Sequence, residues 1–206
     1  MKRYILLMAV MLSTAVSVHA ADPLRALTEK LGSSRLSFGY VYSANRNGVL
    51  MKGSGTAELQ GEAFRMKGDG LEIVSDGTVR WTVDADGREL IIEPVDASAT
   101  DFISNPARLL ANVENAFRTE GSAREQFQGQ TALAYELSPS VSGTGIRRLK
   151  LFFSDQTLVG ASVEVKDGTV TEFSISGMAF STPGPTADFR FDEKTAGSGW
   201  VVTDLR

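Results

Sequence analysis

Apolar and polar positions alternate along most of the chain, which predicts a protein built mainly from β-strands. In residues 36–42, one leucine and three aromatic side chains alternate with smaller ones, a period that separates the two faces of a strand. Asn47-Gly48 then gives a two-residue hairpin signal, and four Asp-Gly pairs later in the chain repeat this turn chemistry. Because neighbouring strands joined by tight turns are antiparallel, the pattern predicts an antiparallel sheet.

About eleven antiparallel strands are expected, and together they predict a large curved sheet or open barrel. The pattern offers thirteen candidate segments for these strands, at residues 36–42, 49–60, 63–67, 71–75, 78–84, 88–95, 125–129, 133–138, 146–154, 158–166, 170–177 and 189–192, with a last short one at 200–202. Neither a long linker nor a shift in composition divides the chain, which indicates a single domain.

Two stretches follow a helical period instead. Residues 23–31 place three leucines on one face, and Gly32 ends the run. A second amphipathic helix is expected within residues 101–120, with Asn105 as its N-cap and Pro106 at the first helical position. Its apolar stripe consists of Leu109, Leu110, Val113 and Phe117. The fold class is therefore an incomplete antiparallel β-barrel with helices across its mouth.

The first twenty residues have the three parts of a secretory signal. Lys2 and Arg3 form a basic start, residues 4–12 are an unbroken apolar run, and Val18-His19-Ala20 precedes the expected cleavage point. A membrane anchor is the alternative, but a span needs about 20 apolar residues, more than this run provides. We therefore expect residues 1–20 to be removed and residues 21–206 to form one soluble periplasmic domain.

The composition excludes several classes of function. The chain has no cysteine, and its single histidine, His19, lies in the expected signal. Without these residues, the mature protein lacks thiol nucleophiles, Ser–His triads, imidazole bases and the usual zinc or haem ligands. It would carry 19 basic and 25 acidic residues, a formal charge of −6, which disfavours nucleic acid. No cofactor, metal or catalytic group is expected.

Several short motifs follow one another in order along residues 21–206. Phe64-Arg65 precedes Ile73-Val74-Ser75-Asp76-Gly77 and Trp81, and Asn105-Pro106 precedes Leu109-Leu110. The other motifs are the strand at 36–42, Leu149-x-Leu151-x-Phe153 with Leu158, residues 171–175, Phe189-x-Phe191 and the end of the chain at 199–206. This ordered set resembles a divergent form of the LolA family, the periplasmic carriers of outer-membrane lipoproteins.

The resemblance implies an apolar cavity for acyl chains under a helical lid, in a monomeric protein that is not an enzyme. It also implies three partners: lipidated lipoproteins, an inner-membrane ABC-type lipoprotein-releasing complex and an outer-membrane acceptor. In the family, an Arg-Pro pair just before the strand that here holds Phe64 helps to hold the lid. This chain has Gln60-Gly61-Glu62 there. The nearest basic residue is Arg65, so the lid is held either by a different residue or by none.

An acyl-chain cavity needs large apolar side chains that pack adaptably, such as aromatic residues and methionine. The expected cavity residues are Phe38, Tyr40, Phe64, Met66, Trp81, Ile92, Leu151, Phe153, Phe173 and Ile175, and the expected lid residues are Leu109, Leu110, Val113 and Phe117. The same residues would equally form an ordinary filled core with a helix capping it. Periodicity alone does not separate a filled barrel from a hollow one, and the resemblance is what favours the cavity.

The expected function is that of a periplasmic chaperone and carrier that takes lipoproteins from the inner to the outer membrane. One alternative is a carrier of another lipid or glycolipid. A second is a periplasmic regulator of the same fold that senses lipid or lipoprotein. A hydrolase using paired carboxylates such as Glu89 with Glu93 is a third, although acids beside β-turns are usually only solvated.

Overall fold

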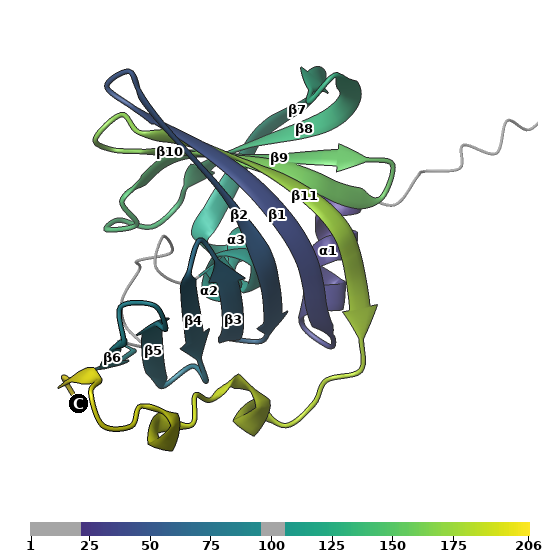
Figure 1. Cartoon of the computed structure of the whole chain (residues 1–206). Coiled ribbons are helices and arrows are strands. Elements are labelled where there is room, and N and C mark those ends of the chain that lie inside the picture. The colour runs from purple at the N-terminus through teal and green to yellow at the C-terminus, as the bar shows by residue number, and fades with distance from the viewer. Residues whose placement is uncertain (1–21, 96–105) are drawn as a thin grey trace, which may run out of the picture.

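A computed structural model describes residues 22–95 and 106–206, with the side chains of 106–108 left out. These residues form one twelve-stranded sheet that curves strongly around three short helices (Figure 1). The strand order is β12-β6-β5-β4-β3-β2-β1-β11-β10-β9-β8-β7, so β7 and β12 are the two edges of an open sheet. The predicted fold class, a mainly β-protein with an incomplete antiparallel barrel, is confirmed.

Most element bounds follow the predicted alternation, and the clearest exception is the strand predicted at 125–129, which begins eight residues earlier as β7. The strands are β1 Arg35–Arg46, β2 Val49–Gln60, β3 Ala63–Gly68, β4 Leu71–Ser75, β5 Val79–Asp84, β6 Glu89–Pro94, β7 Phe117–Phe127, β8 Gln130–Pro139, β9 Ile146–Ser154, β10 Thr157–Val165, β11 Val170–Ser181 and β12 Val201–Asp204. The helices are α1 Pro23–Leu31, α2 Pro106–Ala111 and α3 Val113–Ala116, with 3₁₀ turns η1 Thr186–Phe189 and η2 Glu193–Thr195. The expected signal at 1–20 lies outside the described residues.

Helix α1 starts where the sequence predicts and is tied to the sheet at its first turn. The Asp22 side chain accepts a hydrogen bond from the backbone N–H of Leu24 at 3.0 Å, which caps the helix. The Tyr135 hydroxyl on β8 donates to the same carboxylate at 2.7 Å. Burial, together with this hydrogen bond, raises the pKa of Tyr135 to about 12. The apolar side of α1 therefore stays pressed against the sheet.

The second predicted helix is shorter than expected and is broken in two. Helix α2 ends at Ala111, α3 ends at Ala116, and Asn112 between them has a φ of −114° and a ψ of 12°. Phe117, predicted on the helical stripe, instead begins β7 and pairs with Pro139 on β8. The ladder to β8 outweighs the local helical preference. Residues 101–105, including the predicted cap Asn105, lie outside the described part.

The predicted strand at 189–192 is also corrected. Phe189 closes the 3₁₀ turn η1, and the chain then runs across the lower end of the sheet to β12 (Figure 1). Phe189 and Phe191 alternate as in a strand, but they pack onto the face of the sheet instead of pairing at its edge. The last strand, predicted at 200–202, forms as β12 and pairs parallel with β6. The other paired strands are antiparallel, as predicted.

The two faces of the sheet bury different sets of side chains. The inner face meets the helices, and its main cluster includes Leu36, Phe64, Leu149 and Phe153 together with the leucines of α1. On β3 to β6, alternate residues point the other way, because Val74 pairs with Trp81 and Trp81 pairs with Ile92. This outer-face cluster is covered by Phe189 of the C-terminal segment. The sheet therefore has apolar contents on both faces.

A candidate acyl-chain cavity on the inner face

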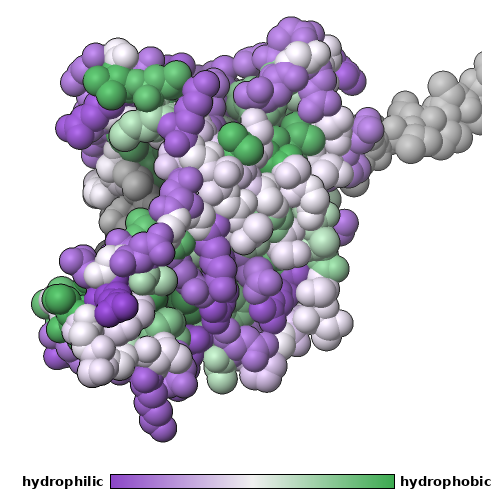
Figure 2. All heavy atoms as spheres, viewed as in Figure 1, coloured by the Kyte–Doolittle hydropathy of each residue, from purple (hydrophilic) through white to green (hydrophobic). Residues whose placement is uncertain are grey.

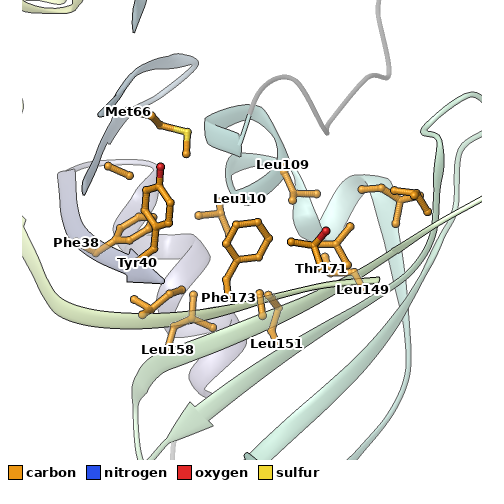
Figure 3. A pocket seen from close by; sticks show the side chains of 16 residues that line it. Phe38, Tyr40, Met66, Leu109, Leu110, Leu149, Leu151, Leu158, Thr171 and Phe173 are labelled. Atoms are coloured by element: carbon orange, nitrogen blue, oxygen red, sulfur yellow. The ribbon is translucent and has the colours of Figure 1, made fainter. Parts of the chain in front are cut away.

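An uncharged cavity of about 170 Å³ lies between the inner face of the sheet and helix α2. The cavity is lined from six neighbouring strands, β3, β2, β1, β11, β10 and β9, and Figure 3 shows how these side chains converge. The sixteen lining residues are Phe38, Tyr40, Ala57, Met66, Leu109, Leu110, Ile146, Leu149, Leu151, Leu158, Ala161, Val163, Val165, Thr171, Phe173 and Ile175. Only Tyr40 and Thr171 carry a polar side-chain atom. The cavity can hold apolar groups by burial, and it offers no charged group for acid–base chemistry.

Strand pairing explains why these residues share one face. Tyr40 on β1 pairs with Ile175 on β11, and Phe173 pairs with Ala161 on β10. Ala161 pairs in turn with Leu151 on β9. Residues paired directly across a sheet point to the same face, so one inner-facing position fixes the row across all four strands.

Aromatic rings and glycines form one wall of the cavity together. Tyr40 on β1 pairs with Gly55 on β2, and a methyl group at Gly55 would lie 2.6 Å from the Tyr40 hydroxyl oxygen. The neighbouring Gly53 leaves the same space for Tyr42. The Phe173 ring meets Tyr40 edge-on at 6.3 Å between centroids. The two glycines therefore leave room for the tyrosine rings beside β2, and of these two rings Tyr40 is the one that lines the cavity.

The hydroxyl groups of this wall stay uncharged. Burial raises the pKa of Tyr40, and the nearby Asp69 and Tyr42 add to the effect. Tyr42 donates a hydrogen bond to an Asp69 carboxylate oxygen at 3.2 Å, at the exposed end of the wall. Deprotonation would place a phenolate against the apolar lining, which burial disfavours.

Helix α2 covers the cavity with two leucines. Leu109 and Leu110 both line it, and Figure 3 shows them opposite Phe38 and Phe173. The helix has only six residues, so its stability comes from packing, chiefly against α1 and β3, and not from its own hydrogen bonds. Val113 and Phe117, the other two predicted lid residues, are fully buried in the inner cluster and do not reach the cavity.

The structure gathers some of the predicted cavity residues and separates others. Phe38, Tyr40, Met66, Leu151, Phe173 and Ile175 line the cavity. Phe64 and Phe153 are on the inner face but lie in the filled cluster. Trp81 and Ile92 lie on the outer face, where the Trp81 indole N–H donates to Glu193 at 2.9 Å. Met66 pairs through Ile73 with Thr82, so Trp81, one residue before Thr82, points to the opposite face. Ile92 pairs with Trp81 and shares that face, where both pack against the C-terminal segment.

Several lining residues lie outside the predicted set, although the period of the strands places them on the same face. Leu149 and Thr171 lie two positions from the predicted Leu151 and Phe173, on the same face of the same strand. Ala161 and Val163 on β10 belong to the same rows. No local signal marks Ala57, a small residue in a strand of mixed polarity, and only its pairing with Phe38 places it in the lining.

Arg65 does not hold the helix that covers the cavity. Its side chain lies on the outer face, where it pairs with Glu72 and donates to the backbone carbonyl oxygens of Asp188 at 2.8 Å and Arg190 at 3.3 Å. It fastens the C-terminal segment to the sheet. Among residues 109–116, whose side chains are described, Leu110 and Val113 anchor the helical region through apolar packing.

Two further features bear on the chemistry available. Within residues 22–95 and 106–206, no group of three or more acidic, histidine or cysteine side chains is arranged to hold a metal ion. The same residues contain no helix that is both long enough and apolar enough to cross a membrane.

No protein-family model matches the sequence, and no curated protein matches it by sequence. Among solved structures, the chain is similar to a conserved protein from Thermus thermophilus, with 13% identity, 88% of this chain and 96% of the other covered, and a TM-score of 0.49. It is also similar to a LolA superfamily protein from Nitrosomonas europaea, with 12% identity, coverage of 84% and 99%, and a TM-score of 0.44. A chain in the MucA/MucB complex of Pseudomonas aeruginosa is similar as well, with 15% identity, 84% of this chain and 60% of the other covered, and a TM-score of 0.34.

These similarities have TM-scores below 0.5 and carry no argument about function. What the cavity binds has to be argued from the cavity itself.

Proposed function

We propose that this protein is a periplasmic carrier that binds the acyl chains of lipoproteins in the inner-face cavity and takes them from the inner to the outer membrane. The observation that carries the proposal is the cavity's lining, sixteen side chains without a charge, beneath a six-residue helix. The motif resemblance in the sequence supports the same role. The carrier would act by binding and release, without catalysing a reaction.

The size of the cavity indicates how it would have to work. Each methylene group moved into water costs about 0.8 kcal/mol, so a carrier must bury most of an acyl chain. An apolar cavity of about 150 Å³ in another protein holds a single benzene ring. A cavity of about 170 Å³ therefore accepts only part of a long chain as it stands. Loading requires helix α2 to move away and uncover the inner face.

We expect this movement to turn about the junction between α2 and α3, with the acyl chain replacing the apolar contacts that the leucines of α2 give up. Helix α2 is separated from α3 by Asn112, whose backbone leaves the helical region, so α2 can swing while α3 stays buried. Leu109 and Leu110 would exchange contact with the cavity wall for contact with the acyl chain. An inner-membrane ABC-type complex that releases lipoproteins would load the carrier, and an acceptor that binds the cargo more tightly would empty it.

Native mass spectrometry of the mature protein, purified gently from its own periplasm, tests the proposed cargo. An acylated protein or peptide that stays bound supports lipoprotein transport. A bound free lipid or glycolipid would favour a carrier of that molecule instead. Depletion of the protein should also leave lipoproteins at the inner membrane, and normal sorting after depletion would contradict the proposal.

The substitution Leu110→Glu tests the cavity itself. A carboxylate against the apolar lining should weaken binding of a fluorescent long-chain fatty acid at least tenfold, a loss of about 1.4 kcal/mol. Circular dichroism should show that the sheet remains folded. Leu205→Glu, at an exposed leucine near the C-terminus, is the matched control and should bind normally. Unchanged binding by the Leu110 variant would show that α2 is not part of the binding site.

A further inference from the structure

The end of the β1–β2 hairpin exposes three consecutive apolar side chains. Val49, Leu50 and Met51 are 64%, 56% and 50% exposed. Runs of exposed apolar residues are unusual in a folded protein and generally mark a contact surface. Figure 2 shows apolar surface at the corner of the molecule where this hairpin ends in Figure 1.

These three side chains point to both faces of the hairpin. Met51 pairs with Ala44, which is on the inner face, and Val49 continues the same row. Leu50 pairs with Asn45 on the outer face, where it lines a groove with Val170 of β11. A filled core covers one face of a strand, so no single core of this protein could cover both sides of the hairpin. The end of the hairpin is an apolar wedge.

Basic side chains outnumber acidic ones around the wedge. Arg46, Lys52 and Lys166 lie in or beside the β1–β2 turn and the adjoining β10–β11 turn, against Asp167 and against Glu172, which lines the same groove as Leu50, so the formal net charge is +1. Arg46 forms an ion pair with Asp167 at 3.5 Å, which joins the two turns. The chain as a whole has a formal net charge of −4. The charge of this corner is therefore opposite to that of the protein.

We propose that this wedge inserts reversibly into the surface of a phospholipid bilayer, with Arg46, Lys52 and Lys166 at the level of the lipid phosphates. A bilayer surrounds an inserted element with apolar medium on all sides, which suits a two-sided wedge. The ladder between β1 and β2 satisfies the backbone groups on one side of β2, while the pairing of β2 with β3 begins only at Gly55. The insertion is therefore shallow, with the other edge of residues 49–54 at the level of the hydrated headgroups. Apolar insertion combined with attraction to anionic lipid is a two-part signal of the kind that gives surface binding.

The wedge lies beside one end of the cavity. Val165 and Thr171, which line the cavity, flank the β10–β11 turn that adjoins the wedge. Insertion would thus bring this end of the cavity to the membrane surface. The contact with lipid does not depend on what the cavity binds, so a carrier of any acylated molecule could use it.

Flotation with vesicles tests the wedge. The mature protein should bind vesicles of phosphatidylglycerol and phosphatidylcholine, and Val49→Ser/Leu50→Ser/Met51→Ser should lower the partition coefficient at least about tenfold. The control is Val201→Ser/Val202→Ser/Leu205→Ser, at positions 62%, 49% and 59% exposed, and it should bind like the wild type. Absence of binding by the wild type, or an equal loss in the control, would overturn the proposal.

A second pair of variants separates insertion from a change in folding. The chain has no cysteine, so a single Leu50→Cys or Leu205→Cys can carry an environment-sensitive dye. Only the dye at position 50 should shift to shorter wavelength with vesicles. Lys52→Gln/Lys166→Gln should reduce binding to anionic vesicles by about fivefold per charge removed. A dye at position 50 that responds to a protein partner but not to vesicles would refute membrane insertion.

Discussion

The inner and outer faces of the sheet carry apolar clusters that look alike in sequence but differ in how they are filled. On the outer face, Val74, Trp81 and Ile92 are buried because the C-terminal segment lies over them and inserts Phe189. On the inner face, Phe38 and Phe173 stay half-buried, since a short helix covers the wall without filling it. The strands show the same alternation of apolar and polar residues on both faces. The two clusters differ because different segments pack onto them.

Polar contacts deepen the contrast. The outer segment is fastened by directed bonds: Arg65 to two of its carbonyl oxygens, Arg190 to Asp76 at 2.9 Å, and Glu193 to the Trp81 indole. Helix α2 contributes two leucines to the cavity wall. A cover fixed by hydrogen bonds suits a permanent core, whereas the apolar contacts described for Leu109 and Leu110 suit a cover that exchanges its contacts.

The largest expected effect on stability comes from removing a large side chain from the filled outer-face cluster. Phe189→Ala should lower the free energy of unfolding by about 4 kcal/mol, because Phe189 is fully buried and its removal leaves a cavity. Phe173→Ala, at the half-buried wall, should cost only about 1 kcal/mol, since the loss is mainly that of its contacts with Tyr40 and Tyr42. Urea unfolding measures both. Equal losses would show that the inner face is as tightly filled as the outer one.

The sequence predicts the elements better than it predicts this division. Alternation located the strands, and Asn47-Gly48 predicted a turn that the structure forms with both residues at positive φ, 52° and 83°. Yet Trp81 and Ile92 alternate as regularly as Phe38 and Tyr40 do. A period of two separates two faces without saying which is inner, and that information comes from long-range packing. Phe189 likewise alternates with polar residues as in a strand, although it is buried because it packs onto the outer face of β3 to β6.

The same limit explains the second predicted helix. Phe117 fits a helical stripe with Leu110 and Val113, and all three are buried in the inner cluster. Its backbone is nevertheless extended, because β8 offers a partner strand. Phe117 is therefore buried from a strand and not from the predicted helical lid. Which of the candidate residues face the cavity depends on how the strands pair, and the sequence does not specify that pairing.

A smaller effect is expected from the turn that fastens the outer segment. Burial of Asp76 opposes its ionisation, but hydrogen bonds from Thr78, from the backbone N–H of Val79 and from Arg190 outweigh it and lower its pKa to about 2. A pKa below the unfolded value means that the charged form stabilises the fold above about pH 4. That contribution, about 2 kcal/mol, should be lost as pH falls from about 4 to 2.

Asp76→Asn checks this pH dependence. The variant should be less stable at pH 7 and should lose less further stability between pH 4 and pH 2 than the wild type does, as followed by urea unfolding. Fatty acid binding at pH 7 should not change, because the turn supports the outer face. Asp86→Asn, at an exposed turn residue, is the control. A wild-type protein with the same stability at pH 4 and pH 2 would refute the role assigned to the Asp76 carboxylate.

The last comparison of the two faces uses tryptophan fluorescence and involves the smallest change in free energy. It is the most direct one, because an indole on each face reports whether the ligand reaches that face. Both tryptophans, Trp81 and Trp200, belong to the outer-face cluster, so saturation with a long-chain fatty acid should leave the emission of the wild type unchanged. Phe173→Trp places an indole in the cavity wall, and its emission should shift to shorter wavelength on binding. Adding Leu110→Glu should move that shift to a fatty acid concentration at least about tenfold higher. A response from the native tryptophans alone would mean that ligand reaches the face covered by Phe189, or that the two faces move together, and either result would end the division between a permanent core and a binding cavity.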